Sequence, residues 1–311
     1  MSKHILDING RKIGGNYPVY IIAEIGSNFN GEFDVAKQII DLAVNAGADA
    51  VKFQSFNVDT WISKDFTVPS VSNSADDWKV YLKQYELSYN LYAEIANYCN
   101  EVKITCFSTP SHISDIDKLY ELNIPAFKFG SVQITDLPTI EYAASKNKPI
   151  IISAGASDMS EIMRVVEVIQ DAGNDQIAML HCTTQYPCED FGLVNLNVLR
   201  SFQSLFDFPI GYSDHTLDPI IIPVAAVSMG AKIIEKHVTL DRNMDGPDHA
   251  VALEPEEFSK MVKAIRLTEK ALGVPYRRIL TEEKEAATIG RRSLVSTRNI
   301  RKGEIITKND I

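Results

Sequence analysis

Short apolar runs alternate with longer amphipathic stretches from Val19 to about Gly273. This alternation is typical of βα units around a parallel sheet, because strands covered on both faces are almost continuously apolar while the connecting helices are apolar on one side only. We predict eight strands, at residues 19–26, 50–56, 104–109, 126–131, 149–154, 177–183, 209–213 and 233–238.

Apolar residues at helical spacing predict helices between these strands. The first begins at Asp34 and stops at Gly47, others cover 91–102 and 159–172, and the last runs from Pro255 to Leu272. Residues 220–229 are almost wholly apolar, which predicts a buried helix. Residues 57–88 are rich in Ser, Asp and aromatic side chains, and we expect a long irregular segment there.

Eight strand and helix units predict an α/β fold of the TIM (β/α)8 barrel type. A doubly wound open sheet is the alternative, but no GxGxxG pattern follows the first strand. In a barrel the carboxyl ends of all strands lie on one face, so residues scattered along the chain meet in one ring. We therefore expect the active site at these ends.

The chain changes character after the last helix. We predict a barrel domain at 1–275, a linker at 276–290 and, at 291–311, the start of a small β domain that is cut short. Residues 293–296 are expected to form a strand, with a turn at 302–304. About twenty residues cannot bury a core of their own.

Composition narrows the class of protein. The 311 residues are 45% hydrophobic and 23% charged with a net charge of -10, which suits an enzyme and argues against general nucleic-acid binding. Neither a membrane span nor a signal peptide is evident, so we expect a cytoplasmic protein. The four cysteines lack CxxC spacing and are expected to be reduced thiols.

Two lysines lie inside apolar strands, Lys52 and Lys128. A buried cation is costly without an anionic partner. A phosphate or carboxylate of a substrate is such a partner, and Ser131, Ser153 and Ser213 at neighbouring strand ends could add hydrogen bonds. The alternative is that each lysine pairs with a Glu or Asp inside the barrel.

Two histidines stand at the ends of adjacent predicted strands, each beside a carboxylate: His215 next to Asp214, and His237 near Glu235. Imidazole and carboxylate suit a divalent cation, and two histidines with open positions fit a catalytic ion better than a structural one. The alternative is a pair of hydrogen-bonded core histidines. For His181 we favour a core residue bonded to a backbone carbonyl.

Other polar residues flank this ring. Glu24 ends the first strand and could orient a substrate hydroxyl or transfer a proton, or could simply pair with Lys52. We expect His249 in a loop near the pocket, with Asp248 as the better substrate ligand. The central expectation is that Lys52 and Lys128 surround the same cavity as the two histidines.

At these residues the chain resembles the sialic acid synthase family. The matching segments occur in the family's order and cover nearly the whole chain: 22–26 (IAEIG), 51–54 (VKFQ), 128–131 (KFGS), 180–183 (LHCT), 186–187 (YP), 211–216 (GYSDHT), 235–237 (EKH), 246–249 (GPDH) and 291–295 (RRSLV).

The resemblance implies an enzyme that condenses phosphoenolpyruvate with an N-acylated hexosamine, forming a nonulosonic acid and releasing phosphate by C–O cleavage. It implies a homodimer in which antifreeze-like (SAF) domains are exchanged, and a divalent ion, usually Mn²⁺ with Mg²⁺ or Co²⁺ as alternatives, held by His215 and His237. The implied phosphoenolpyruvate ligands are Lys52, Lys128, Ser131, Ser153, Thr184 and Ser213. The residues implied to face the sugar are Glu24, Gln54, Gln133, Tyr186 and Asp248, with Glu24 and Glu235 as candidate proton-transfer groups.

The chain departs from the family's pattern at three positions on the substrate side, Phe29, Gln133 and Thr184, and ends before the segment that carries a sugar-binding arginine. The acceptor thus stays open between N-acetylmannosamine and a bacterial diamino relative. Two other functions remain as alternatives: a divalent-metal hydrolase on the same barrel, and a silent sugar-binding homologue.

Overall fold

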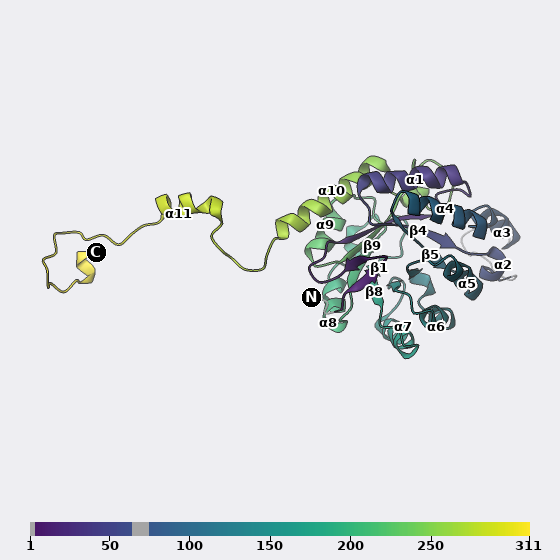
Figure 1. The fold of residues 1–311 in the computed structure, drawn as a ribbon, viewed down its shortest axis with the longest axis horizontal. Helices are drawn as coiled ribbons and strands as arrows, with labels where there is room; N and C mark the ends of the chain where they lie inside the picture. Colours follow the sequence, from purple (N-terminus) through teal and green to yellow (C-terminus); the bar gives the residue numbers. More distant parts are fainter. Residues whose placement is uncertain (1–3, 64–74) are drawn as a thin grey trace. The chain divides into compact units, whose positions relative to one another are not determined.

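The computed structural model describes residues 4–63 and 75–311, which divide into two compact units, Met1–Leu272 and Gly273–Ile311. The first unit contains a closed barrel of parallel strands in the order β10-β3-β4-β5-β6-β7-β8-β9 (Figure 1). The predicted TIM barrel is confirmed. Its strands are β3 Tyr20–Gly26, β4 Ala50–Ser55, β5 Thr105–Pro110, β6 Phe127–Phe129, β7 Ile150–Ser153, β8 Ile177–Cys182, β9 Ile210–Asp214 and β10 Ile233–His237.

Each of the eight predicted barrel strands has an observed counterpart, and most bounds differ by one or two residues. The shortest barrel strand, β6, ends at Phe129 where 131 was predicted, because Gly130 leads directly into the 3-10 helix Ser131–Gln133. The barrel closes where β10 pairs with β3, with His237 opposite Glu24. Closure thus places the last predicted site residues beside the first.

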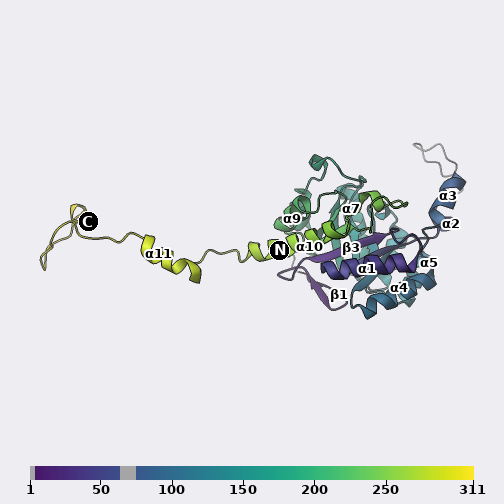
Figure 2. The same cartoon turned by 90° about the horizontal axis from the view of Figure 1, so that it is seen from above.

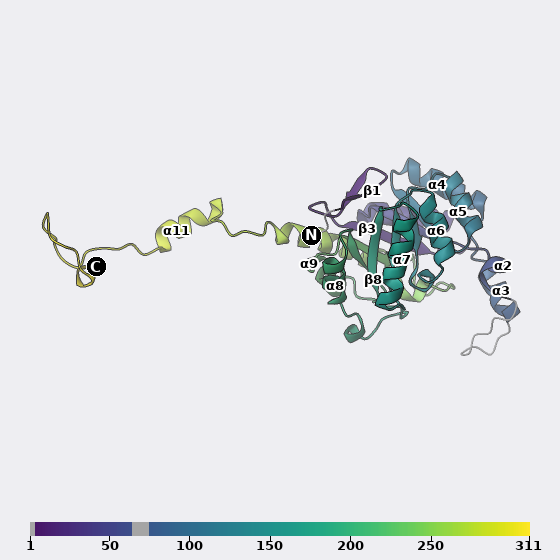
Figure 3. The same ribbon diagram turned by 90° about the horizontal axis from the view of Figure 1, so that it is seen from below.

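Helices surround the barrel in all views (Figures 1, 2 and 3). Gly47 ends α1 in a left-handed conformation with φ 87°, as the sequence predicts. Asp158 and Glu161 form a capping box at the start of α7. The helices packed on the barrel are α1 Phe33–Ala46, α4 Tyr89–Glu101, α5 Ile113–Glu121, α6 Leu137–Ser145, α7 Met159–Asp171, α8 Val198–Leu205, α9 Ile221–Ser228 and α10 Pro255–Leu272.

An N-terminal hairpin precedes the barrel and was not predicted. It consists of β1 Leu6–Ile8 and β2 Arg11–Ile13, and β1 lies outside the barrel wall in Figure 3. Its apolar residues join the cluster formed by the first residues of the barrel strands, such as Tyr20 and Ala50. The hairpin therefore closes the end of the barrel where the strands begin, and leaves the opposite end for the site.

The segment predicted as irregular, 57–88, contains two helices outside the barrel wall, α2 Val58–Trp61 and α3 Ala75–Lys83 (Figure 2). Residues 64–74 of that prediction lie outside the described residues. Asn57 starts α2 by accepting a hydrogen bond from Asp59 N at 2.9 Å. Phe56, Val58 and Tyr85 form a small core of their own, which the local composition did not indicate.

The second unit contains the helix α11 Lys284–Gly290 and short 3-10 turns at Thr281–Glu283 and Lys308–Asp310. The predicted strand at 293–296 is wrong: Leu294 and Val295 are 85% and 70% exposed, and no described residue pairs with them in a ladder. A strand without a partner gains no ladder hydrogen bonds. The antifreeze-like domain stays a prediction.

Two further properties concern the chain as a whole. All four cysteines are buried and free, as predicted. Among the residues that the structure describes, no helix combines the length and the apolar character that crossing a membrane requires.

Candidate active site

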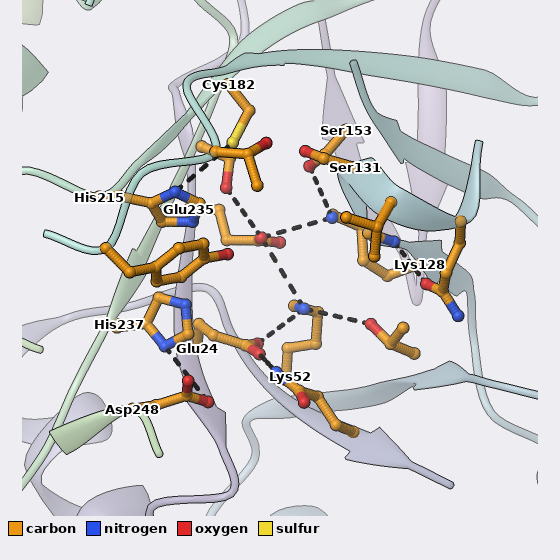
Figure 4. A pocket seen from close by; sticks show the side chains of 18 of the residues that line it. Glu24, Lys52, Lys128, Ser131, Ser153, Cys182, His215, Glu235, His237 and Asp248 are labelled. Carbon is orange, nitrogen blue, oxygen red and sulfur yellow. Dashed lines mark hydrogen bonds and ion pairs between the residues drawn. The ribbon is translucent and has the colours of Figure 1, made fainter. Parts of the chain in front are cut away.

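One cavity of about 270 Å³ lies at the carboxyl ends of the barrel strands (Figure 4). Each of the eight barrel strands contributes to its wall, and the four groups of the central expectation, Lys52, Lys128, His215 and His237, all line it. The structure also brings the other predicted site residues to this cavity: Glu24, Gln54, Ser131, Gln133, Ser153, Thr184, Tyr186, Ser213, Glu235 and Asp248.

Lys52 is 4% exposed and lies among carboxylates. Its Nζ is 2.8 Å from Glu24 Oε2 and 3.8 Å from Glu235 Oε1, and it donates a hydrogen bond to Thr109 Oγ1 at 3.2 Å. Burial alone would lower the pKa of Lys52, but Glu235 and Glu24 together raise the pKa above its ordinary value. The ion pair between Glu24 and Lys52, one of the two roles considered for Glu24, is therefore present. Glu24 also lines the cavity, so a contact with substrate stays open.

Lys128 is equally buried but has less compensation. Its Nζ donates to Ser153 Oγ at 2.7 Å and to Phe129 O at 3.1 Å, and Glu235 Oε1 lies 3.4 Å away. Burial lowers the pKa of Lys128 below its ordinary value, and Glu235 does not fully offset this. An anion bound beside Lys128 would therefore stabilise the charged ammonium.

Glu235 links the two lysines. Besides the ion pairs, its Oε1 accepts a hydrogen bond from Ser213 Oγ at 3.1 Å. Burial alone would raise the pKa of Glu235, but Lys128 and Lys52 lower the pKa to about 2. Its Oε2 is buried and has no hydrogen-bond partner among the described residues. The ionised carboxylate thus keeps one oxygen free at the cavity.

The two imidazoles lie 5.6 Å apart between ring centroids. His215 Nδ1 lies 2.9 Å from Thr183 O, and because a carbonyl can only accept, Nδ1 carries the proton and Nε2 keeps its lone pair. Burial and the neighbouring His237 lower the pKa of His215 to about 3. The ring of Tyr186 covers His215 at a centroid distance of 4.0 Å.

His237 and Asp248 form a looser pair. The distance from His237 Nδ1 to Asp248 Oδ2 is 4.0 Å, and Nδ1 has no hydrogen-bond partner among the described residues. Figure 4 shows both groups at the edge of the same cavity as His215. His237 therefore has a free ring nitrogen beside a carboxylate.

These residues fit a divalent cation in two respects. His215 and His237 each have a ring nitrogen available as a ligand. The cavity wall carries two lysines and the three carboxylates Glu24, Glu235 and Asp248, hence one net negative charge while the imidazoles are neutral, so a trianionic substrate would gain from an added cation. In the described part of the chain no group of three His, Cys, Asp or Glu could hold a metal ion alone, so an ion held by the two histidines would need further ligands from substrate or water.

We call the part of the cavity lined by Lys52 and Lys128 the lysine side, and the part lined by His215 and His237 the imidazole side. A glycine makes room for the hydroxyl groups on the lysine side. Gly155 N donates to Ser131 Oγ at 3.1 Å. A Cβ at Gly155 would lie 2.3 Å from Thr184 Oγ1 and 2.7 Å from Ser131 Oγ. Both hydroxyls can therefore approach this backbone only because residue 155 has no side chain. Thr184 Oγ1 has no hydrogen-bond partner among the described residues.

The two predicted glutamines make different contacts. Gln133 Oε1 accepts from Gly130 N at 2.7 Å and its Nε2 donates to Pro110 O at 2.7 Å, so its amide joins two strand ends. Gln54 Nε2 donates to Glu24 Oε1 at 3.0 Å. Gln133 therefore shapes the wall of the cavity. Its predicted contact with a sugar would use the second lone pair of Oε1 or the second proton of Nε2.

Asp214 does not belong to the cavity, contrary to the prediction that it shares a metal site with the histidines. It faces the opposite side of β9, where its Oδ2 lies 2.7 Å from Lys236 Nζ, and both side chains are fully buried. Successive strand residues point to opposite faces, so Ser213 and His215 exclude Asp214 from the cavity side.

Two other histidines, His181 and His249, are structural. His181 Nε2 lies 2.9 Å from Val194 O, which confirms the predicted core histidine. His249 was expected near the pocket, but it is fully buried between Thr239 Oγ1 at 2.6 Å and Asn30 Oδ1 at 3.1 Å. Its neighbour Asp248 lines the cavity instead.

Sequence reasoning missed several wall residues. Phe56, Trp61 and Val132 add apolar surface, with Trp61 46% and Val132 71% exposed. Cys182 could have been found, because it follows the outward His181 and alternation turns it inward. No local signal marked Trp61, which lies in the segment predicted as irregular.

Known proteins resemble this chain along most of its length. A model described as the NeuB family matches residues 39–276. The N,N'-diacetyllegionaminic acid synthase of Campylobacter jejuni is 38% identical, with 94% of this chain and 88% of that protein covered. The N-acetylneuraminate-9-phosphate synthase of Homo sapiens is also 38% identical, over 96% and 83%. The crystal structure of the N-acetylneuraminic acid synthetase from Leptospira borgpetersenii has a TM-score of 0.82 and 31% identity, over 92% of this chain and 97% of that one.

Proposed function

The chain belongs to the NeuB family, and from this premise we propose that it condenses phosphoenolpyruvate with an N-acylated hexosamine to form a nonulosonic acid and inorganic phosphate. One observation carries the proposal: two buried lysines and two imidazoles with free ring nitrogens line the same cavity at the carboxyl ends of the barrel strands. The lysines can bind an anion and the imidazoles can hold an ion that activates a carbonyl, both within one cavity.

The lysine side receives phosphoenolpyruvate. Lys128 gains a counter-ion when the substrate's anionic groups approach, and the hydroxyls of Ser131, Ser153 and Thr184 lie around the same part of the cavity. Charge-assisted hydrogen bonds of this kind also stabilise the charge that develops on departing phosphate.

The reaction balances with one water. The methylene carbon of phosphoenolpyruvate forms a bond to the aldehyde carbon of the open-chain sugar, and the broken C=O π bond leaves an alkoxide that takes one proton to become a hydroxyl. Water adds to C2, and the C2–O bond to phosphate breaks as the new C2 hydroxyl becomes the ketone, so that one proton of the water balances the sugar hydroxyl and the other leaves with phosphate. Glu24 and Glu235 are the carboxylates on the wall that can take the proton of this water. Phosphate leaves with its bridging oxygen.

The imidazole side receives the sugar aldehyde. His215 and His237 would hold a divalent ion, which when bound supplies Lewis-acid polarisation of the aldehyde oxygen. Thr183 O keeps His215 in the tautomer that leaves Nε2 free. Tyr186 covers the His215 ring and shields it from solvent.

Apolar side chains of the cavity wall favour an acylated sugar as the substrate. Phe56 and Trp61 line the cavity in contact with each other, with ring centroids 4.9 Å apart, and Val132 also lines the cavity. Burying the methyl of an acyl group there would add on the order of 0.8 kcal/mol. Gln54 and Asp248 supply polar groups for sugar hydroxyls.

Phosphate release tests the proposal. The full chain is incubated with Mn²⁺, phosphoenolpyruvate labelled with ¹⁸O at the bridging oxygen, and a panel of N-acyl and diacetamido hexosamines. We expect labelled phosphate only when a matching sugar is present, together with an equal amount of a new 2-keto acid. A folded chain that releases none with any sugar contradicts the proposal.

Two measurements separate the alternatives. A divalent-metal hydrolase would act on its substrate without phosphoenolpyruvate. A silent homologue would bind a sugar in calorimetry but release no phosphate. The exchanged homodimer and the choice of Mn²⁺ remain predictions, to be measured by sedimentation and by titration with Mn²⁺, Mg²⁺ and Co²⁺.

A further inference from the structure

A buried ion pair lies on the outer face of the two strands that carry the imidazoles. Lys236 on β10 and Asp214 on β9 are register partners, and both side chains are fully buried. Neither lines the cavity. Burying a pair of charges often adds little net stability compared with apolar residues of similar volume, so the stability of the barrel alone does not explain this one.

Both charges act on the residue after His215. Asp214 Oδ1 accepts a hydrogen bond from Thr216 N at 2.9 Å. Lys236 Nζ donates to Thr216 O and, at 3.3 Å, to Thr216 Oγ1. The backbone on both sides of His215 is thereby fixed, and Cys188 N donates to His215 O at 2.9 Å as a third anchor.

The same pair is attached to the other imidazole. Lys236 immediately precedes His237, whose carbonyl accepts from Leu253 N at 2.8 Å. A shift of Lys236 relative to Asp214 would therefore change the distance between the two rings, now 5.6 Å between centroids. A rigid spacing matters because ligand nitrogens must stay within a few tenths of an ångström of their positions to share one ion.

We propose that Asp214, Lys236 and Thr216 form a positioning lock that sets the spacing of His215 and His237 from behind the barrel wall. The lock does not touch substrate. It rests on the proposed function only for the use of the imidazoles, since their spacing can be measured without any turnover.

The decisive variant is the double substitution Asp214→Leu with Lys236→Met, which replaces the ion pair with apolar side chains and removes all three hydrogen bonds to Thr216. We expect it to fold with little change in melting temperature. Its crystal structure should show His215 displaced or in several orientations, and calorimetry with Mn²⁺ alone should show a dissociation constant at least tenfold higher. KM for phosphoenolpyruvate should change less than kcat, because the lysine side is intact.

A second double variant keeps hydrogen-bonding groups at both positions but removes the charges, and it should restore Mn²⁺ binding. Asp214→Asn with Lys236→Gln keeps an acceptor for Thr216 N and a donor for Thr216 O without the charges, and should keep the Mn²⁺ affinity within about threefold. The matched control is Asp117→Leu with Lys146→Met, which removes a 2.9 Å ion pair remote from the cavity and should leave ring spacing and Mn²⁺ affinity unchanged.

The lock is overturned if the folded apolar variant keeps the 5.6 Å ring spacing and its Mn²⁺ affinity, or if the folded neutral variant loses that affinity. The second criterion decides even when the apolar variant does not fold. Phosphate release by the unaltered chain is measured separately: a failure there contradicts the proposed function, while the ring spacing still decides the lock.

Discussion

The lysine side and the imidazole side of the cavity satisfy their polar groups in different ways. On the lysine side each ammonium has close partners, such as Glu24 for Lys52 and Ser153 for Lys128. On the imidazole side His237 Nδ1 has no hydrogen-bond partner among the described residues, and His215 uses only one ring nitrogen. The first region is arranged around ammonium and carboxylate groups, which suits anion binding, while the second offers ring nitrogens as ligands, which suits cation binding.

The largest expected effect comes from removing the less compensated lysine. Lys128→Met should lower kcat/KM for phosphoenolpyruvate by about 100- to 1000-fold, because it removes a buried charge that would contact the substrate anion. Steady-state kinetics with the matching sugar measures this. Lys263→Met on the exposed surface of α10 is the control, and an equal loss there would contradict a local role for Lys128.

Removing an imidazole should separate the two regions. We expect His237→Ala to raise the Mn²⁺ dissociation constant by more than about tenfold and to leave phosphoenolpyruvate binding within about threefold. Calorimetry with each ligand alone makes both measurements. His112→Ala, which removes an imidazole that caps α5 and does not line the cavity, should change neither constant. If both constants change together in His237→Ala, the two sides are not independent.

The glycine behind the hydroxyls tests the lysine side without altering a charge. Gly155→Ala places a methyl 2.3 Å from Thr184 Oγ1, and overpacking of this kind costs roughly 1–3 kcal/mol. We expect KM for phosphoenolpyruvate to rise by about tenfold while Mn²⁺ affinity is retained. Gly290→Ala, where a Cβ would meet nothing within 4 Å, is the matched control.

The smallest effect is expected at Gln133, which joins two strand ends on the lysine side. Gln133→Glu keeps an acceptor for Gly130 N but places a carboxylate oxygen against Pro110 O, now 2.7 Å from the donated amide. One lost hydrogen bond of about 1 kcal/mol predicts a few-fold rise in KM for phosphoenolpyruvate. No change in either KM or melting temperature would show that this amide bridge has no influence on the cavity.

Much of the fold was predictable because its signals are local. Alternation of apolar runs and amphipathic helices indicated eight βα units, and all eight strands are present. The N-terminal hairpin was missed because two three-residue strands give too little periodicity to detect. The expected strand at 293–296 failed for the opposite reason, since the β-branched and apolar residues there have no strand to pair with among the described residues.

The site was predictable as a set of residues but not as a set of contacts. Polar residues at strand ends had to meet once the strands formed a barrel. Period-two alternation could have excluded Asp214, whose neighbours both face the cavity. Trp61 and the closeness of Gly155 to Thr184 depend on how loops fold over the barrel end, which no local pattern encodes.

The sequence by itself determined the order of strands and helices and which side chains stand at strand ends, because hydrophobic periodicity is a property of neighbouring residues. Only the tertiary structure decided that Lys52 has a surplus of carboxylate partners while Lys128 has a deficit. The physical reason is that pairing and pKa depend on distances of a few ångströms between residues far apart in the chain, which are set by barrel closure and strand register.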